Sequence, residues 1–222
     1  MAILLIRHGE TLGNRNRILQ VPETPLSDRG LEQADRLGQR LASAPIKEIW
    51  TSHLARARMT AQAVERATRA PLLEVPELEE RNFGSLRGTP YADLDFDPFM
   101  AGYAPPEGES WEVFHDRVDR TWQKIERHWL DRFSKASGVE HLAIVSHGLF
   151  LRALIERILL SPEELATHGD ENGQIVIGNT ALTVVAPGIP GTANSEHRVE
   201  LVACTAHLEG ETAHDVQSIV GI

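Results

Sequence analysis

Two short stretches, far apart in the chain, each place a histidine and a glycine directly after an apolar run. They are LLIRHGE at Leu4–Glu10 and AIVSHGL at Ala143–Leu149. An imidazole can serve as a nucleophile or carry a proton, and a glycine lets the backbone turn sharply or approach a ligand closely. Each histidine, His8 or His147, could instead be a structural residue that bonds to the backbone at the end of a strand.

Two arginines and an amide accompany these features. Arg7 immediately precedes His8, and Asn14 belongs to the polar stretch that follows it. Arg56, in TSHLARARMTA, falls near the expected start of a helix, where free N–H groups and the helix dipole favour an anion. Its guanidinium would grip that anion with two parallel N–H groups, whereas a solvated surface arginine is the simpler alternative.

A pair of carboxyl groups, Glu79 and Glu80, lies in LEERNFG. Both could be exposed, or one could act as a general acid if its pKa were raised. Two strand-end histidines, two arginines and a carboxyl group are together the components of an anion site that contains a nucleophile. This combination predicts phosphate chemistry, although each residue alone has a structural interpretation.

The elements that must position these residues alternate between strands and helices. Ala2–Ile6 is a continuous apolar run, which is typical of a strand buried on both faces of a parallel sheet. Further strands or extended segments are expected at 47–52, 71–78, 141–146, 174–179, 181–187 and 197–204. Helices are expected at 27–42, 54–67, 110–129, 149–160 and 161–169, several of them behind serine N-caps.

This order predicts an α/β fold with a mainly parallel central sheet and helices on both faces. Ligands of such sheets bind beyond the carboxyl ends of the strands. If the two strands that end in His-Gly are parallel neighbours, both histidines emerge at the same edge, where a cleft can form.

Length and composition set limits on the function. The 222 residues suit one domain with a modest insertion, and the net charge of −10 argues against a general nucleic-acid surface. The single Cys204 rules out an intrachain disulfide and a cysteine-rich metal site. We expect a cytoplasmic protein with no membrane partner, because the sequence shows no secretory signal and no apolar segment long enough to span a bilayer. The segment 81–109, rich in Gly, Pro and Asp, is expected to be a lid-like insertion.

Six blocks of sequence, in order, carry a resemblance to a known family. The blocks are LLIRHGET, PLSDRGLEQA, TSHLARARMTA, LEERNFGSLRG, PPEGES and VSHG. They resemble the histidine phosphatase superfamily, also called the phosphoglycerate mutase-like family. This resemblance implies one three-layer histidine phosphatase domain over residues 1–222, with the insertion at about 81–109.

The resemblance also implies a role for each matched residue. His8 corresponds to the nucleophile that becomes phosphohistidine, and Glu80 corresponds to the proton donor. The residues expected to contact the phosphate are Arg7, His8, Asn14, Arg56, His147 and Gly148. The expected chemistry needs neutral His8, a protonated His147 beside the arginines, and neither metal nor cofactor, since guanidinium groups stabilise the phosphoryl charge.

Two enzyme classes within that family remain to be weighed. A mutase must hold a second anionic group, but ETLGN lacks the tryptophan found in similar mutases, and the segment 87–110 contains Arg87 without a lysine or an arginine pair. The insertion instead carries several acidic residues, which would repel a bisphosphate. We therefore expect a phosphatase acting on a small-molecule phosphomonoester, with phosphoglycerate mutase as the alternative.

Two further interpretations belong to other classes of protein. One is a catalytically idle binding protein that keeps the pocket, and the other is a metal site formed by His8, His147 and Glu80. Flanking arginines would repel a cation and so disfavour the metal site. The sequence leaves the physiological substrate and a homodimer open.

Overall fold

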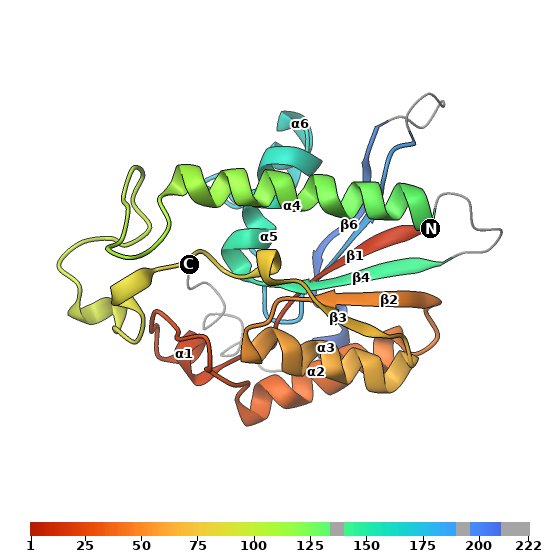
Figure 1. Cartoon of the computed structure of the whole chain (residues 1–222), viewed down its shortest axis with the longest axis horizontal. Coiled ribbons are helices and arrows are strands. Elements are labelled where there is room, and N and C mark those ends of the chain that lie inside the picture. Colours follow the sequence, from red (N-terminus) through yellow and green to blue (C-terminus); the bar gives the residue numbers. More distant parts are fainter. Residues whose placement is uncertain (134–139, 190–195, 210–222) are drawn as a thin grey trace.

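The computed structural model describes residues 1–133, 140–189 and 196–209, and it contains a six-stranded sheet (Figure 1). The strands are β1 (Ala2–Arg7), β2 (Ile46–Thr51), β3 (Leu72–Glu74), β4 (His141–Ser146), β5 (Leu182–Ala186) and β6 (Arg198–Cys204). Their order is β3-β2-β4-β1-β5-β6. The first four in this order are parallel, and β5 and β6 are antiparallel to their neighbours. The prediction of a mainly parallel α/β sheet is confirmed.

Helices cover both faces of the sheet, which gives the three expected layers (Figure 1). On one face lie α2 (Asp28–Leu41) and α3 (Ala55–Thr68), and on the other lie α4 (Trp111–Arg132) and α5 (Gly148–Leu154). The short helices α1 (Leu12–Arg15) and α6 (Pro162–His168) complete the set. Each face has its own apolar core, because the buried side chains of the sheet alternate between the two helical layers.

The helices begin where the serine N-caps predict. The side chains of Ser27, Ser110 and Ser161 accept hydrogen bonds from backbone N–H groups in the first turns of α2, α4 and α6. In α4 the apolar stripe from Phe114 to Trp129 is buried and forms core, as its spacing indicates. The stripe fixes α4 against the sheet, and this places the end of the 81–109 insertion beside the carboxyl ends of the strands.

The structure corrects three of the expected elements. The extended segment expected at 71–78 is a strand only over Leu72–Glu74, and Pro76–Leu78 forms a 3-10 turn. Residues 174–179 form no strand, although Ile175 and Ile177 are buried. The place beside β1 is taken by β5, and the carbonyl of Ile177 accepts a hydrogen bond from Arg7 Nη1 instead of joining a ladder. The helix expected at 149–160 is α-helical only to Leu154 and continues as a π-helical turn at Ile155–Leu159.

The strand register brings the two His-Gly endings together. β1 and β4 are parallel neighbours with Arg7 opposite Ser146, and the His8 N–H donates to the Ser146 carbonyl at 3.0 Å. No helix among the described residues is long and apolar enough to cross a membrane. The extent of the single domain, 1–222, stays a prediction, because residues 210–222 lie outside the described part of the chain.

Candidate active site

His8 and His147 lie side by side at the carboxyl ends of β1 and β4. Their ring centroids are 5.1 Å apart, and both side chains are buried. Each residue follows the last residue of its strand, so the parallel register, rather than local sequence, determines this proximity. The sequence-based prediction that the two endings share one edge is confirmed.

His8 is held as a neutral imidazole. Its Nδ1 lies 2.7 Å from the carbonyl oxygen of Gly9, which can only accept, so Nδ1 carries the proton and Nε2 keeps a lone pair. Burial and then the positive charges of Arg56 and Arg7 hold the pKa of His8 well below its usual value. A neutral imidazole with a free Nε2 lone pair is the form that can act as a nucleophile.

The surroundings of His147 favour its neutral form, whereas the sequence predicts a protonated residue beside a phosphoryl group. Burial, followed by the charge of Arg56, holds the pKa of His147 well below its usual value. Its Nε2 lies 2.8 Å from Ser52 Oγ, and its buried Nδ1 has no partner among the described residues. The negative charge of a phosphoryl group beside it would oppose the lowering of the pKa.

Ser52 was not identified in the sequence. It immediately follows β2, the strand beside β4, and its N–H donates to the Val145 carbonyl at 3.0 Å. A polar residue at a third neighbouring strand end was the available signal, but recognising it requires the strand order.

Arg7 and Arg56 bring two buried guanidinium groups to the same place. Arg7 is held by the Ile177 carbonyl, and Arg56 Nη1 donates to the Val21 carbonyl at 3.2 Å. Burial lowers the pKa of each to about 10, so both remain charged at pH 7. The Nε atoms of both are buried and have no hydrogen-bond partner within the described residues. Buried donors of this kind are normally satisfied, so these are available to an anion.

Glu80 faces this group from the start of the insertion. Its Oε1 accepts from the N–H groups of Arg81 and Phe150, at 3.0 and 3.2 Å. Its Oε2 accepts from the Leu149 N–H at 3.0 Å. Two of these donors belong to the first turn of α5, and the carboxyl group is thereby fixed at one wall of the pocket.

A narrow pocket of about 50 Å³ joins most of the residues expected at the site. Of that set, those lining it are Arg7, His8, Asn14, Arg56 and Glu80. His147 does not line it but lies against His8, and Gly148 serves as the first residue of α5. The side chains of Arg87 and Tyr91, which sequence reasoning gave no role, also form walls.

Two glycines allow the loop after β1 to pass close to α2. A Cβ added to Gly9 would lie 2.6 Å from the Gly30 carbonyl oxygen, and one added to Gly30 would lie 2.0 Å from the Glu10 carbonyl oxygen. Real Cβ atoms do not approach this closely. The glycine after His8 therefore serves packing of the loop, while Glu10 below it is buried and bonds Arg15, Ser27 and Arg29.

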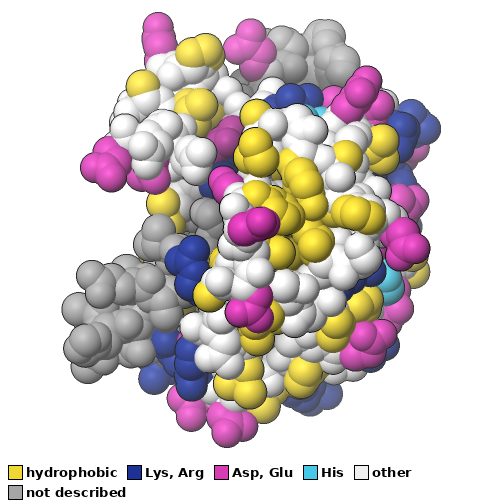
Figure 2. All heavy atoms as spheres, turned by 90° about the vertical axis from the view of Figure 1, so that its left-hand side faces the viewer, with side chains coloured by type: hydrophobic (Ala, Val, Ile, Leu, Met, Phe, Trp, Pro, Cys, Tyr) yellow, Lys and Arg dark blue, Asp and Glu magenta, His cyan; other side chains and the backbone are white. Residues whose placement is uncertain are grey.

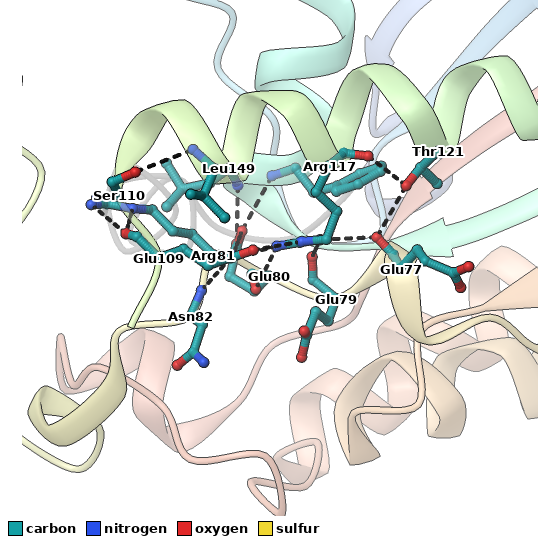
Figure 3. A network of polar contacts seen from close by, with 12 residues as sticks. Glu77, Glu79, Glu80, Arg81, Asn82, Glu109, Ser110, Arg117, Thr121 and Leu149 are labelled. Atoms are coloured by element: carbon teal, nitrogen blue, oxygen red, sulfur yellow. Dashed lines mark hydrogen bonds and ion pairs between the residues drawn. The ribbon is translucent and has the colours of Figure 1, made fainter. Parts of the chain in front are cut away.

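A second network holds the segment that carries Glu80 (Figure 3). The Arg117 guanidinium, from α4, donates to the carbonyls of Glu77 and Glu79 at 2.9 Å and to that of Glu80 at 3.3 Å. It also forms a two-point ion pair with Glu109 at 2.8 and 2.7 Å. The backbone on the N-terminal side of the Glu80 side chain is thus tied to a core helix.

The 81–109 insertion is fastened at both of its ends. Arg81, 1% exposed, donates to the carbonyls of Glu109 and Tyr103, and its guanidinium stacks on the Trp111 ring at 3.9 Å. Gly84 adopts a φ of +53°, and a Cβ there would lie 1.9 Å from the Pro106 carbonyl oxygen. The start and end of the insertion therefore cross in direct backbone contact.

No group of three or more His, Cys, Asp or Glu residues within the described ranges is arranged to hold a metal ion. The set of His8, His147 and Glu80, considered above as metal ligands, is therefore not arranged as a metal site. The cations already present in the pocket are the guanidinium groups of Arg7, Arg56, Arg81 and Arg87.

Comparisons with known proteins agree with this geometry. The model of the histidine phosphatase superfamily (branch 1) matches residues 3–187. The chain is 33% identical over 178 residues to the adenosylcobalamin/alpha-ribazole phosphatase of Salmonella typhimurium, covering 76% of this chain and 84% of that protein. It is 33% identical over 170 residues to the metal-independent phosphoserine phosphatase of Arabidopsis thaliana, covering 70% of this chain and 68% of that one.

Solved structures show the same arrangement of elements. A putative alpha-ribazole-5'-P phosphatase from Escherichia coli superposes with a TM-score of 0.73 at 26% identity, covering 92% of this chain and 97% of its own. A structure titled mycobacterial hydrolase 1 superposes with a TM-score of 0.74 at 24% identity, covering 91% and 98% of the two chains. At that lower identity the likeness concerns the fold.

Proposed function

The chain belongs to the histidine phosphatase superfamily, and we propose that it hydrolyses a small-molecule phosphomonoester through a phosphohistidine formed on His8. Phosphatases among its relatives identify it as a phosphoric monoester hydrolase rather than a mutase. One observation supports the proposed intermediate most directly: neutral His8 lies beside buried, unpartnered nitrogens of Arg7, Arg56 and His147.

In the first step the Nε2 lone pair of His8 attacks phosphorus in line. A P–N bond forms, the P–O bond to the alcohol breaks, and Glu80 supplies the proton that the departing oxygen needs. The positive charges of Arg7 and Arg56 stabilise the charge on the equatorial phosphoryl oxygens. His147 contributes an N–H donor to the same oxygens.

In the second step water replaces the imidazole on phosphorus. Glu80, now ionised, takes a proton from the water as its oxygen bonds to phosphorus. The P–N bond breaks, phosphate leaves, and His8 returns to the neutral form. Glu80 is again protonated, so one carboxyl group serves both half-reactions.

The experiment is hydrolysis of 4-nitrophenyl phosphate with EDTA present. We expect activity in the wild type and a loss of at least about 10³-fold in His8→Ala, because the nucleophile is removed. His168→Ala, at the end of α6 and outside the pocket, is the control and should keep full activity.

Brief exposure to substrate followed by peptide mass spectrometry should find phosphate on His8. Equal turnover by wild type and His8→Ala would rule out this nucleophile. Absence of any turnover or label would support the idle binding protein instead. Interconversion of phosphoglycerates stimulated by a bisphosphate would restore the mutase alternative.

The surroundings of the protein form a separate part of the proposal. A single cysteine in 222 residues fits a reducing compartment such as the cytoplasm. The absence of nucleic-acid and membrane partners, and a homodimer, stay predictions. Fractionation of cells and light scattering of the purified protein test the location and the oligomeric state.

A further inference from the structure

A second, wider cavity adjoins the phosphate pocket. Its volume is about 800 Å³, and it shares Tyr91, Phe99 and Leu149 as walls with the narrow pocket. The narrow pocket is too small for more than the phosphoryl end of an ester, so the alcohol part must extend elsewhere. The shared walls place the wider cavity directly beside the phosphate pocket, where the alcohol part can be received.

Aromatic rings form one side of this cavity. Phe99 packs edge-on against both Tyr91 and Phe83, with centroids 5.4 and 5.5 Å apart. Trp111 is fixed from two directions, because its Nε1 donates to the Met100 carbonyl at 2.9 Å and Arg81 stacks on its ring. Rings held in this way present flat apolar surface to a planar group without further loss of side-chain entropy.

Arginine side chains form another part of the cavity wall. Arg152, half-buried on α5, bonds to Gln174 Oε1 at 2.9 Å. Arg17 lies over the Tyr91 ring at 5.3 Å and makes no hydrogen bond through its side chain to the described residues. Arg157 is only weakly paired, 3.4 Å from Asp119. Guanidinium groups with unused donors are suited to a planar anion.

The carboxylates of the same cavity offset only part of this charge. They are Asp97 and Glu156, against three arginines. Asp97 already accepts from the Phe99 N–H at 2.9 Å, and Glu156 accepts from the Ile175 N–H at 2.7 Å. This excess of positive charge contrasts with the chain's net charge of −10. At this end of the molecule acidic side chains are spread around an apolar area, and a few Lys and Arg side chains border the hollow at the left of Figure 2.

We propose that the wider cavity is the subsite for the alcohol part of the substrate, and that this part combines a planar apolar group with a second anionic group bound by Arg152 and Arg17. The proposal rests on the proposed phosphatase function and names the class of its substrate. It also revises the expectation that acidic residues of the insertion exclude a second anion, because arginines outside the insertion supply the binding charge.

The test uses three phenyl phosphates that differ only in the group at the para position. They carry a carboxymethyl, a carbamoylmethyl or an aminomethyl group at that position, and each is called below by the name of its para group. The methylene spacer keeps the three phenol leaving groups similar. For the wild type we expect kcat/KM to be about 10- to 100-fold higher for the carboxymethyl ester than for the carbamoylmethyl ester, as a charge-assisted hydrogen bond provides. The aminomethyl ester should be the poorest substrate.

Variants locate the preference. Arg152→Gln and Arg17→Gln should each reduce the preference for the carboxymethyl ester mainly through KM, and Arg152→Lys should retain part of it. Arg120→Gln, which removes an exposed arginine of α4 outside the cavity, is the matched control and should retain all of it. Equal kcat/KM for the carboxymethyl and carbamoylmethyl esters in the wild type, or an unchanged preference in the Arg17→Gln/Arg152→Gln double variant, overturns the subsite.

Binding to His8→Ala separates failure of the subsite from failure of the phosphatase. Calorimetry measures the Kd of the three esters without turnover. Tighter binding of the carboxymethyl ester supports the subsite even if the wild type hydrolyses none of the esters, an outcome that contradicts the proposed phosphatase only. Equal Kd values for the carboxymethyl and carbamoylmethyl esters overturn the subsite whether or not hydrolysis occurs.

Discussion

The strand-end pocket and the 81–109 insertion both border the reacting group, but they are built differently. In the pocket, His8 and His147 follow buried parallel strands and owe their positions to the sheet register. The insertion contains two short 3-10 turns. It is held by backbone hydrogen bonds to residues 17–19 and by side chains, chiefly Arg81 and the Arg117–Glu109 pair. Chemistry common to a family can therefore reside in the sheet, while the insertion supplies only part of the wall of the wider cavity.

Glu80 lies at the junction of these regions and gives the sharpest comparison between them. Glu80→Gln keeps the shape but removes the transferable proton. We expect kcat to fall about 10²- to 10⁴-fold for alkyl phosphates, whose alkoxides must be protonated as they leave. For 4-nitrophenyl phosphate the rate of the first step should fall much less, because nitrophenolate leaves without being protonated.

Burst kinetics with 4-nitrophenyl phosphate would show which of the two steps is slowed in Glu80→Gln. A rapid release of nitrophenolate followed by slow turnover is expected if Glu80 also activates water in the second step. Equal losses for alkyl and nitrophenyl esters in that first phase would contradict the role of Glu80 as the acid.

Arg56 tests the pocket side of the comparison. Arg56→Met removes a buried charge next to both histidines, and we expect kcat/KM to fall about 10²- to 10³-fold for every phosphomonoester, as when one preorganised donor to a transition state is lost. Arg58→Met, two residues along α3 with a half-exposed side chain, is the control and should change little. A loss that depended strongly on the alcohol would place Arg56 with the insertion instead.

The sequence revealed the pocket better than the insertion for a physical reason. Apolar strands that end in RHG and SHG are local patterns, and the rule that ligands bind at carboxyl strand ends converts them into a shared location. Ser52 escaped notice because its role depends on β2 lying beside β4, a long-range pairing. The charge on His147 depends on burial, which a sequence does not display and which favours the neutral form, as well as on the phosphoryl group expected beside it.

The insertion offered no comparable pattern. Arg117 lies in the middle of a regular helix, where an arginine is ordinarily solvated, and its five hydrogen bonds go mostly to backbone carbonyls. Backbone acceptors carry no residue signature. In the same way, the strand expected at 174–179 shared the apolar composition of a real strand, but its carbonyl at Ile177 bonds Arg7 instead of a neighbouring strand.

Arg117→Met sharpens the comparison from the insertion side. It leaves the largely buried Glu109 carboxylate with the Asn82 N–H but without its ion-pair partner, and breaking a buried pair costs about 3 to 5 kcal/mol of unfolding free energy. If Arg117 positions Glu80, kcat for alkyl phosphates should fall about 10-fold, because the proton donor is misplaced. The fall in kcat for nitrophenyl phosphate should be smaller. Arg120→Met on the exposed side of α4 is the control.

Thermal unfolding and the two kcat values, measured below the unfolding temperature of the variant, check this prediction. A uniform loss for both esters would assign Arg117 to stability alone.

The pH dependence of stability distinguishes the two regions as well. His8 and His147 have pKa values well below the usual 6.5, because burial and Arg56 disfavour their charged forms. Below pH 6.5 the unfolded chain therefore binds more protons than the folded one, and stability falls as the pH is lowered. The slope is about 1.4 kcal/mol per pH unit for each histidine that stays neutral.

Urea unfolding of the wild type and of His147→Asn, at pH 7.5 and 5.5, measures this slope. The loss between the two values should be smaller in the variant. His115→Asn, in the partly exposed ring contacts of α4, should flatten the slope less. Identical slopes in wild type and His147→Asn would contradict a neutral, buried His147.

The smallest effect is expected from the acidic residues of the insertion. Asp93 and Asp95 are exposed and have no ion pair or side-chain hydrogen bond within the described residues. At 0.15 M salt the Debye length is about 8 Å, so the Asp93→Asn/Asp95→Asn variant should change kcat/KM less than about twofold. At 0.01 M salt the Debye length is about 30 Å, so charges on the insertion act over the whole cavity. There the kcat/KM of the variant should rise more for a carboxylated ester than for a neutral one. A gain of fivefold or more that persists at 0.15 M salt would mean that these carboxylates meet the substrate directly, and selection would then belong to the insertion itself rather than to the arginines across the cavity.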